Sequence, residues 1–256
     1  MLVLEIQRGK NEMKECAYHK EAGTTAACTR RLIEATEYCG LGNPERQRAK
    51  EEERRETFIF DSWFGGVLAT NQVKATHKDE NGMPAGHECI GAVKTNHKLF
   101  PKKELETLMR AWPSGSSILL SCMQPNGVEL LAMGYKYNMR KVLSFIFTKD
   151  AGSSAPGDPY IARFPDKFGN VKTRKIPRPA VISKYFSASN VVDSHNQSRQ
   201  YCLKLEKLWV TQDPWFRIDT TILGMTFVDC WRSLKLQSTN KTMQNLRMAD
   251  FADLLA

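Results

Sequence analysis

Short apolar runs separated by turn-rich segments characterise the middle of the chain and predict β-strands there. The runs SILLSC (117–122), VELLAMGYKY (128–137) and KVLSFIFT (141–148) predict three strands, with QPNGV as the hairpin turn between the first two. An earlier run, TFIF, has no polar break and predicts a buried strand that ends at Asp61. Residues 1–8 predict one further strand.

Apolar positions spaced by three or four residues predict helices in the rest of the chain. Residues 218–235 have the strongest such pattern, because their apolar positions form one broad side. The polar segment 42–56 predicts either an exposed helix or a loose connector, and the turn-rich residues 78–88 mark a boundary. Further helices are predicted over residues 24–38, 66–76, the segment after Pro101, 190–208 and 248–256.

This order of elements predicts an α/β fold with a mixed sheet flanked by helices. The strands cluster between helical segments, so the pattern favours a core that carries an inserted β-rich subdomain. We expect residues 1–88 to form the first part of the core, residues 89–140 the insertion, and residues 141–256 the second part with C-terminal helices.

Composition and charge narrow the class of partner. The 256 residues are 41% hydrophobic, which allows a sizeable core and argues against global disorder. Lys and Arg number 37 against 28 Asp and Glu, a net charge of +9 that favours a polyanionic partner, although a solvated basic surface fits it too. The longest apolar runs predict no membrane span and the start predicts no signal peptide. Seven scattered cysteines predict reduced intracellular thiols.

Asp61 is the first candidate for chemistry, because an acid at the end of a buried strand needs water, a donor or a cation. The residue could cap the following helix through the turn at Ser62 and Gly65–Gly66, could be an ordinary loop acid, or could bind a metal at the rim of the sheet.

Asp193 is the second candidate. It lies in a predicted helix with Asn196 three residues later on the same face, and oxygen ligands in this arrangement suit a hard cation. The competing interpretation is an acid that stabilises the start of a helix. Together, Asp61 and Asp193 suggest a split carboxylate site of the kind that positions two Mg²⁺ ions in phosphoryl-transfer nucleases.

The chain resembles the DDE transposase domain of piggyBac-type elements. The segments that carry the resemblance occur in the family's order: FDSWFGGV, IGAVKTNHKLFP, IPRPAVISKYFSASNVVDSHNQSRQY and LWVTQDPWFRIDTTILGMTFVDCWRSLK. The third segment is similar to a basic Pro-x-Pro motif followed by a tyrosine-containing strand and then an Asp. The resemblance implies an RNase H-like fold with an inserted domain, and Mg²⁺ or Mn²⁺ bound by Asp61, Asp193 and Asn196. It implies DNA as a partner, strand cleavage and transfer as the activity, and a nuclear location, and it allows a homodimer.

The chain also departs from the family's pattern. The strand that carries the family's first catalytic Asp would precede residues 1–8, and Asn196 stands where the family has an acid. We therefore expect an N-terminally truncated or degenerate copy that is inactive alone. Two alternatives stay open: a non-catalytic, transposase-derived DNA-binding protein, and a basic α/β interaction module without a DNA role.

Basic residues form two clusters that either contact DNA phosphates or form a solvated face. The first cluster is Lys94, Lys98, Lys102 and Lys103, and the second is Lys172, Arg174, Lys175 and Arg178.

Other candidates have weaker support. The spacing of Cys16, His19, Cys28 and Cys39 fits no compact zinc motif. His195 is either a proton shuttle beside Asp193 or a polar position on its helix. Trp209 and Trp215 either stack on bases or pack in the core, and core packing is the prediction for Trp231.

Overall fold

The computed structural model describes residues 10–38, 55–94, 99–165 and 167–254. The chain divides into two compact units, with the boundary between Ala188 and Ser189. The strand predicted at residues 1–8 lies outside the described residues, as do Cys39, Lys98 and most of the polar segment 42–56.

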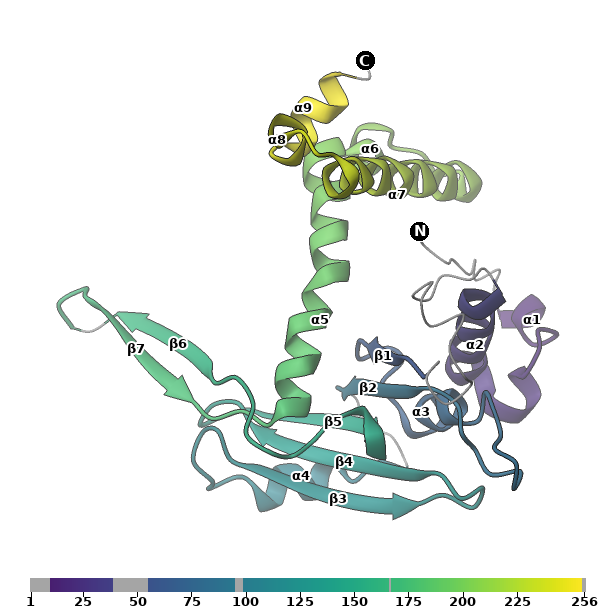
Figure 1. The fold of residues 1–256 in the computed structure, drawn as a ribbon, viewed down its shortest axis with the longest axis vertical. Coiled ribbons are helices and arrows are strands. Elements are labelled where there is room, and N and C mark those ends of the chain that lie inside the picture. The colour runs from purple at the N-terminus through teal and green to yellow at the C-terminus, as the bar shows by residue number, and fades with distance from the viewer. Residues whose placement is uncertain (1–9, 39–54, 95–98, 166, 255–256) are drawn as a thin grey trace. The chain divides into compact units, whose positions relative to one another are not determined.

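The first unit is built on a five-stranded mixed sheet with the strand order β1-β2-β5-β4-β3 (Figure 1). Strand β1 is parallel to β2, and the other neighbours are antiparallel. The three strands predicted from the apolar runs are confirmed as β3, β4 and β5. The strands are β1 (Thr57–Phe60), β2 (Glu88–Val93), β3 (Ser117–Met123), β4 (Glu129–Lys136) and β5 (Val142–Thr148).

Helices flank this sheet, which confirms the prediction of a mixed α/β fold. They are α1 (Lys10–Met13), α2 (His19–Tyr38), α3 (Val67–Lys74), α4 (Lys102–Leu108) and the first part of α5 (Ala180–Gln197), with a short 3-10 turn η3 (Lys149–Ala151) after β5. The helices α2, α3 and α4 coincide with segments predicted to be helical.

Residues 89–140, the predicted inserted subdomain, contribute β3, β4 and most of β2 to the same sheet as β1 and β5. The division of the chain into a two-part core and an insertion stays a prediction.

The core consists of two apolar layers, one on each face of the sheet. Alternate residues of a strand point to opposite faces, so neighbouring residues of β5 belong to different layers. Phe145 packs in the layer that contains Val181 and Ile182 of α5. Ile146 packs in the layer that contains Leu105 of α4.

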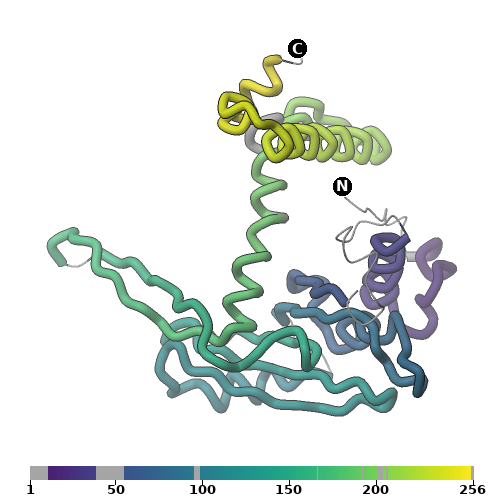
Figure 2. The backbone as a smooth tube through the Cα atoms, viewed as in Figure 1, coloured from purple at the N-terminus to yellow at the C-terminus, as the bar shows by residue number. Residues whose placement is uncertain are grey.

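A separate two-stranded ribbon follows η3 and extends from the sheet (Figure 2). Its strands are β6 (Tyr160–Pro165) and β7 (Val171–Ile176), paired antiparallel. Most of their side chains are exposed, whereas Ile176 at the base is buried. Two strands alone bury little apolar surface, so the ribbon depends on its base for its position.

Helix α5 corrects two sequence-based expectations. It begins at Ala180, ten residues before the predicted start at residue 190, and the expected tyrosine-containing strand is helical at Tyr185. Pro177 and Pro179 favour an extended chain for the residues that precede them. They do not restrict the residues that follow, so a helix can begin at Ala180. Helical spacing then places Val181, Ile182 and Tyr185 on one side, facing the sheet.

The second unit contains helices from Ser189 onward. The single predicted helix 190–208 is interrupted by a π-helix and by Lys204 in the left-handed conformation (φ 55°). The predicted helix 218–235 is confirmed within α7, and Trp231 packs in the core with Val228, as expected. The remaining elements are η4 (Ser198–Leu203), α6 (Leu205–Leu208), α7 (Pro214–Gln237), α8 (Lys241–Gln244) and α9 (Met248–Asp253).

Candidate nucleic-acid interface

Asp61 lies directly after β1 and is exposed. Its Oδ1 accepts a hydrogen bond from the backbone N–H of Trp63 at 2.9 Å, and its carbonyl oxygen accepts from Gly65 at 3.0 Å. The N-cap position of α3 belongs to Gly66, so the expectation that Asp61 caps this helix is wrong. Asp61 instead closes the turn with one oxygen, and its Oδ2 has no hydrogen bond to any described residue.

The turn after Asp61 is held against the end of β2. A Cβ atom on Gly65 would lie 1.8 Å from the carbonyl oxygen of Ala92, so only glycine fits. Phe60 pairs with Gly91, and the two strands are parallel. Their carboxyl ends therefore meet at one edge of the sheet, and Asp61 lies at the same edge as Ala92 and the residues that follow it.

A pocket of about 790 Å³ lies at this edge. We call it the basic pocket, because among the described residues its charged lining consists of six basic side chains and one carboxylate. These are Lys94, Lys102, Arg110, Lys136, Arg140, Lys141 and Glu106. The Nζ of Lys102 donates a hydrogen bond to the carbonyl oxygen of Lys94 and lies 3.6 Å from Glu106.

The structure thus brings two members of the first predicted cluster, Lys94 and Lys102, into one pocket, while Lys103 is exposed and does not line it. The sequence analysis missed the four other cations. Lys136 interrupts an apolar strand, and Arg140–Lys141 precede the next strand, so both places carried a signal in the sequence.

Three of the four residues of the second predicted cluster lie on β7, and Arg178 comes after it. Lys172, Arg174 and Lys175 are exposed, and pairing places Arg174 opposite Ala162 and Lys175 opposite Ile161. Successive strand residues point to opposite faces, so both faces of the ribbon carry a cation. On β6, Arg163 adds another exposed cation that the sequence analysis did not single out.

Arg178 has a different environment from its predicted partners. It is half-buried, and its guanidinium carbon lies 5.4 Å from the ring centre of Tyr160 and 5.1 Å from that of Phe186. Such cation–π contacts stabilise the base of the ribbon.

Asp193 and Asn196 lie close to the C-terminal end of α5, so the alternative that Asp193 stabilises a helix start is wrong. Asp193 is exposed and Asn196 is half-buried. Asp61 belongs to the first unit and Asp193 to the second. Their combination in one metal site stays a prediction.

His195 forms a pair with an acid other than Asp193. Its Nε2 lies 3.1 Å from Oδ1 of Asp229 on α7, and the neighbouring Ser194 accepts a hydrogen bond from Arg232 at 3.0 Å. These contacts join α5 to α7 within the second unit and favour the interpretation of His195 as a structural polar residue.

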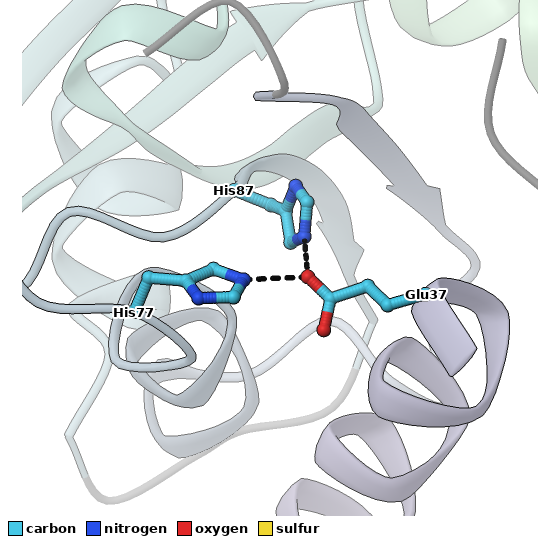
Figure 3. A group of neighbouring side chains, drawn as sticks. All are labelled: Glu37, His77 and His87. Atoms are coloured by element: carbon cyan, nitrogen blue, oxygen red, sulfur yellow. Dashed lines mark hydrogen bonds and ion pairs between the residues drawn. The ribbon is translucent and has the colours of Figure 1, made fainter. Parts of the chain in front are cut away.

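A cluster of Glu37, His77 and His87 was not anticipated from the sequence (Figure 3). Oε1 of Glu37 lies 2.5 Å from Nε2 of His77 and 2.6 Å from Nε2 of His87. Burial raises the pKa of Glu37, but hydrogen bonds from the two histidines outweigh this effect, so the pKa of Glu37 lies below its ordinary value. The only sequence signal is a pair of histidines flanking the turn-rich segment 78–86.

The hydrogen bonds of His87 decide what this cluster can do. Nδ1 of His87 accepts a hydrogen bond from the backbone N–H of Glu56 at 3.1 Å, so the ring proton is on Nε2, facing Glu37. A histidine that binds a metal through Nε2 has its proton on Nδ1 and donates it to an acceptor. The cluster is therefore a hydrogen-bonded group and a poor metal site.

The remaining candidates are dispersed. Among the described residues, Cys16, His19 and Cys28 do not join a group of three metal ligands. Trp215 is 63% exposed, and Trp209 is 48% exposed with its ring centre 6.1 Å from that of Phe216. Both tryptophans are therefore accessible for stacking, unlike Trp231.

Comparison of the chain with protein-family models, with curated proteins and with solved structures finds no match. Within the part of the chain that the structure describes, no helix has both the length and the apolar character that crossing a bilayer requires.

Proposed function

We propose that this chain is a piggyBac-type, transposase-derived protein that binds DNA, with its five-stranded sheet as the core of an RNase H-like DDE domain. The ordered sequence motifs support the family, and the basic ribbon supports the function. The same proposal implies a nuclear location and genomic DNA or transposon ends as the partner. Catalysis by this chain alone is not part of it.

The observation that carries the proposal is the ribbon β6–β7, which presents cations on both faces and projects from the sheet. A two-stranded ribbon fits the major groove of B-DNA. Lys172 and Arg174 lie on one face, and Lys175 and Arg163 on the other, all exposed. Exposed cations on opposite faces of such a ribbon suit the two phosphate backbones that border a groove.

A second candidate function, metal-dependent strand cleavage, is favoured by the position of Asp61. An exposed acid at the carboxyl edge of parallel strands is suited to bind a cation, and the adjacent basic pocket is suited to nucleic acid. Asp61, Asp193 and Asn196 would then bind Mg²⁺ or Mn²⁺. Two carboxylates supply less charge than the three or four of a complete site, so this activity ranks second.

Salt-dependent DNA binding tests the first function. Fluorescence anisotropy measures the binding of a labelled duplex to the wild type and to Arg174→Ala/Lys175→Ala. The salt concentration is varied from about 50 to about 200 mM, a range over which electrostatic binding to DNA weakens strongly. We expect the slope of log K against log salt, which is negative, to become less steep by about two in the double variant. Lys14→Ala/Lys78→Ala, which removes two exposed cations elsewhere, serves as the control and keeps the wild-type slope.

If the wild type folds but shows no salt-dependent binding, DNA binding is wrong and the chain is better described as a basic α/β interaction module. Titration calorimetry with Mn²⁺ on the wild type and on Asp61→Ala tests the second function. Saturable binding that Asp61→Ala removes supports a surviving metal site.

A further inference from the structure

The basic pocket contains a buried ammonium group without a carboxylate partner. Lys136 is 2% exposed, and its Nζ donates a hydrogen bond to the carbonyl oxygen of Arg110 at 2.8 Å. None of the ion pairs among the described residues includes Lys136. An ammonium has three N–H donors, and a buried charge is costly unless an opposite charge offsets it. The ammonium group of Lys136 is therefore suited to bind an anion.

A second buried polar group in the pocket has no partner in the part of the chain that the structure describes. Ser144 is 3% exposed, and its Oγ has no hydrogen-bond partner among the described residues. In the pairing of β4 with β5, Lys136 lies opposite Val142 and Gly134 opposite Ser144. Lys136 and Ser144 therefore point to the same face of the sheet, the face that α4 covers.

The pocket has a charged side and an apolar side. On the α4 face, Lys102 and Arg110 accompany Lys136 and Ser144, while Glu106 is the single carboxylate. The pocket also reaches the α5 face of the sheet at the strand ends, where its lining is Ala92, Leu143, Phe145, Tyr185 and Phe186. A volume of about 790 Å³ lies within the range of about 300–1,000 Å³ for small-molecule sites. An inorganic anion would use the charged side alone.

We propose that the basic pocket binds the phosphate group of a nucleotide. Lys136 and Ser144 donate hydrogen bonds to the phosphate oxygens, the surrounding cations add charge, and the apolar side contacts the sugar and base. The nucleotide is either the phosphorylated end of a DNA strand or a free nucleotide, which share this chemistry. For a strand end the inference rests on the DNA-binding function proposed above, and for a free nucleotide it stands alone.

Binding of four ligands to the full chain separates these sources: a 5′-phosphorylated single-stranded oligonucleotide, its unphosphorylated form, adenosine monophosphate and inorganic phosphate. Titration calorimetry compares the wild type with Lys136→Met, Ser144→Ala and the control Lys20→Met. Lys20 is an exposed lysine of α2 that does not line the pocket. We expect Lys136→Met to weaken nucleotide binding by about tenfold or more and Ser144→Ala by about fivefold, while Lys20→Met has no effect.

Lys136→Met removes a buried charge without a carboxylate partner and should keep the fold, which the thermal midpoint checks. If it does not fold, Arg140→Gln in the exposed turn replaces it, with the same expected direction. If the phosphorylated oligonucleotide binds more tightly than both its unphosphorylated form and adenosine monophosphate, the ligand is the strand end. If adenosine monophosphate binds more tightly than the phosphorylated oligonucleotide, the ligand is the free nucleotide.

Two results would overturn the inference. One is nucleotide binding that Lys136→Met and Ser144→Ala leave unchanged. The other is a wild type that binds no nucleotide, or that binds inorganic phosphate as tightly as it binds a nucleotide. Duplex binding through the ribbon is measured on the same variants. Weaker duplex binding in Arg174→Ala/Lys175→Ala but not in Lys136→Met separates the pocket from the proposed DNA-binding function, so that either can fail alone.

Discussion

The Nε2 atom of His87 lies 2.6 Å from Oε1 of Glu37. This contact joins the C-terminal end of α2 to the residue that precedes β2. The second ring nitrogen of His87 accepts the backbone N–H of Glu56, directly before β1. One buried imidazole thus connects a helix with the beginning of both parallel strands, and both of its nitrogens are engaged.

The tautomer of His87 is the first prediction. Long-range ¹H–¹⁵N spectra should show the ring proton of His87 on Nε2, because Nδ1 already accepts a hydrogen bond. Zn²⁺ should leave these resonances in place, and His77→Ala should not change the affinity of the protein for Zn²⁺. A ring protonated at Nδ1, with resonances that shift on adding Zn²⁺, would support a metal site instead.

The carboxylate of Glu37 should contribute to stability through its hydrogen bonds. Glu37→Ala removes the acceptor of the buried Nε2–H of His87 and should lower the free energy of unfolding by about 1–3 kcal/mol. Glu37→Gln keeps an oxygen acceptor and should cost less. Urea denaturation of the two variants measures the difference. Equal losses would show that the charge of Glu37, and not its hydrogen bonds, is responsible.

The pH dependence of stability follows from the direction of the Glu37 shift. Its pKa in the folded protein lies below its ordinary value. Its contribution is therefore fully present above the unfolded pKa of about 4.3 and is lost as the pH falls through the folded pKa. Thermal midpoints between about pH 6 and 3 should fall less steeply in Glu37→Gln than in the wild type. Parallel curves for the two proteins would contradict this role.

Gly65 should be irreplaceable at the edge that carries Asp61. Gly65→Ala places a methyl group against the backbone of Ala92 and should cost more than about 3 kcal/mol, because backbone atoms cannot move aside cheaply. The control is Gly82→Ala, whose Cβ meets no atom within 4 Å but whose φ is +76°. That change should cost only about 1 kcal/mol. Comparable losses would mean that the turn after Asp61 relaxes easily.

Asn196 offers a gain-of-function test of the proposed metal site. Asn196→Asp adds a third carboxylate to the set proposed with Asp61 and Asp193, and should tighten Mn²⁺ binding about tenfold. Asn190→Asp, an exposed position on the same helix, is the matched control and should have no effect. Calorimetry that finds the same affinity in both variants would remove Asn196 from the site.

Local sequence pattern predicted the elements whose periodicity lies within one segment. The strands β3 to β5 follow from apolar runs and a turn between them, and α7 follows from its broad apolar side. The position of Asp61 at a strand end was predictable for the same reason. The beginning of α5 was not predictable in this way. Tyr185 and Phe186 favour a strand by propensity, but they are helical here because the helix packs both rings against Phe145.

The candidate sites depended on contacts between elements, which strand order and register decide. Lys94 and Lys102 were visible as a basic cluster, but only the pairing of β2 with β5 and β4 brings them together with Lys136 and the buried Ser144. Likewise, nothing local connects Glu37 with His77 and His87, which come from separate segments. The sequence by itself determined β1, β3 to β5, α7 and the basic character of the protein, whereas it did not predict the ribbon β6–β7. The tertiary structure decided which charges are buried and which meet, because burial depends on the chain segments that pack around a group and not on its neighbours in sequence.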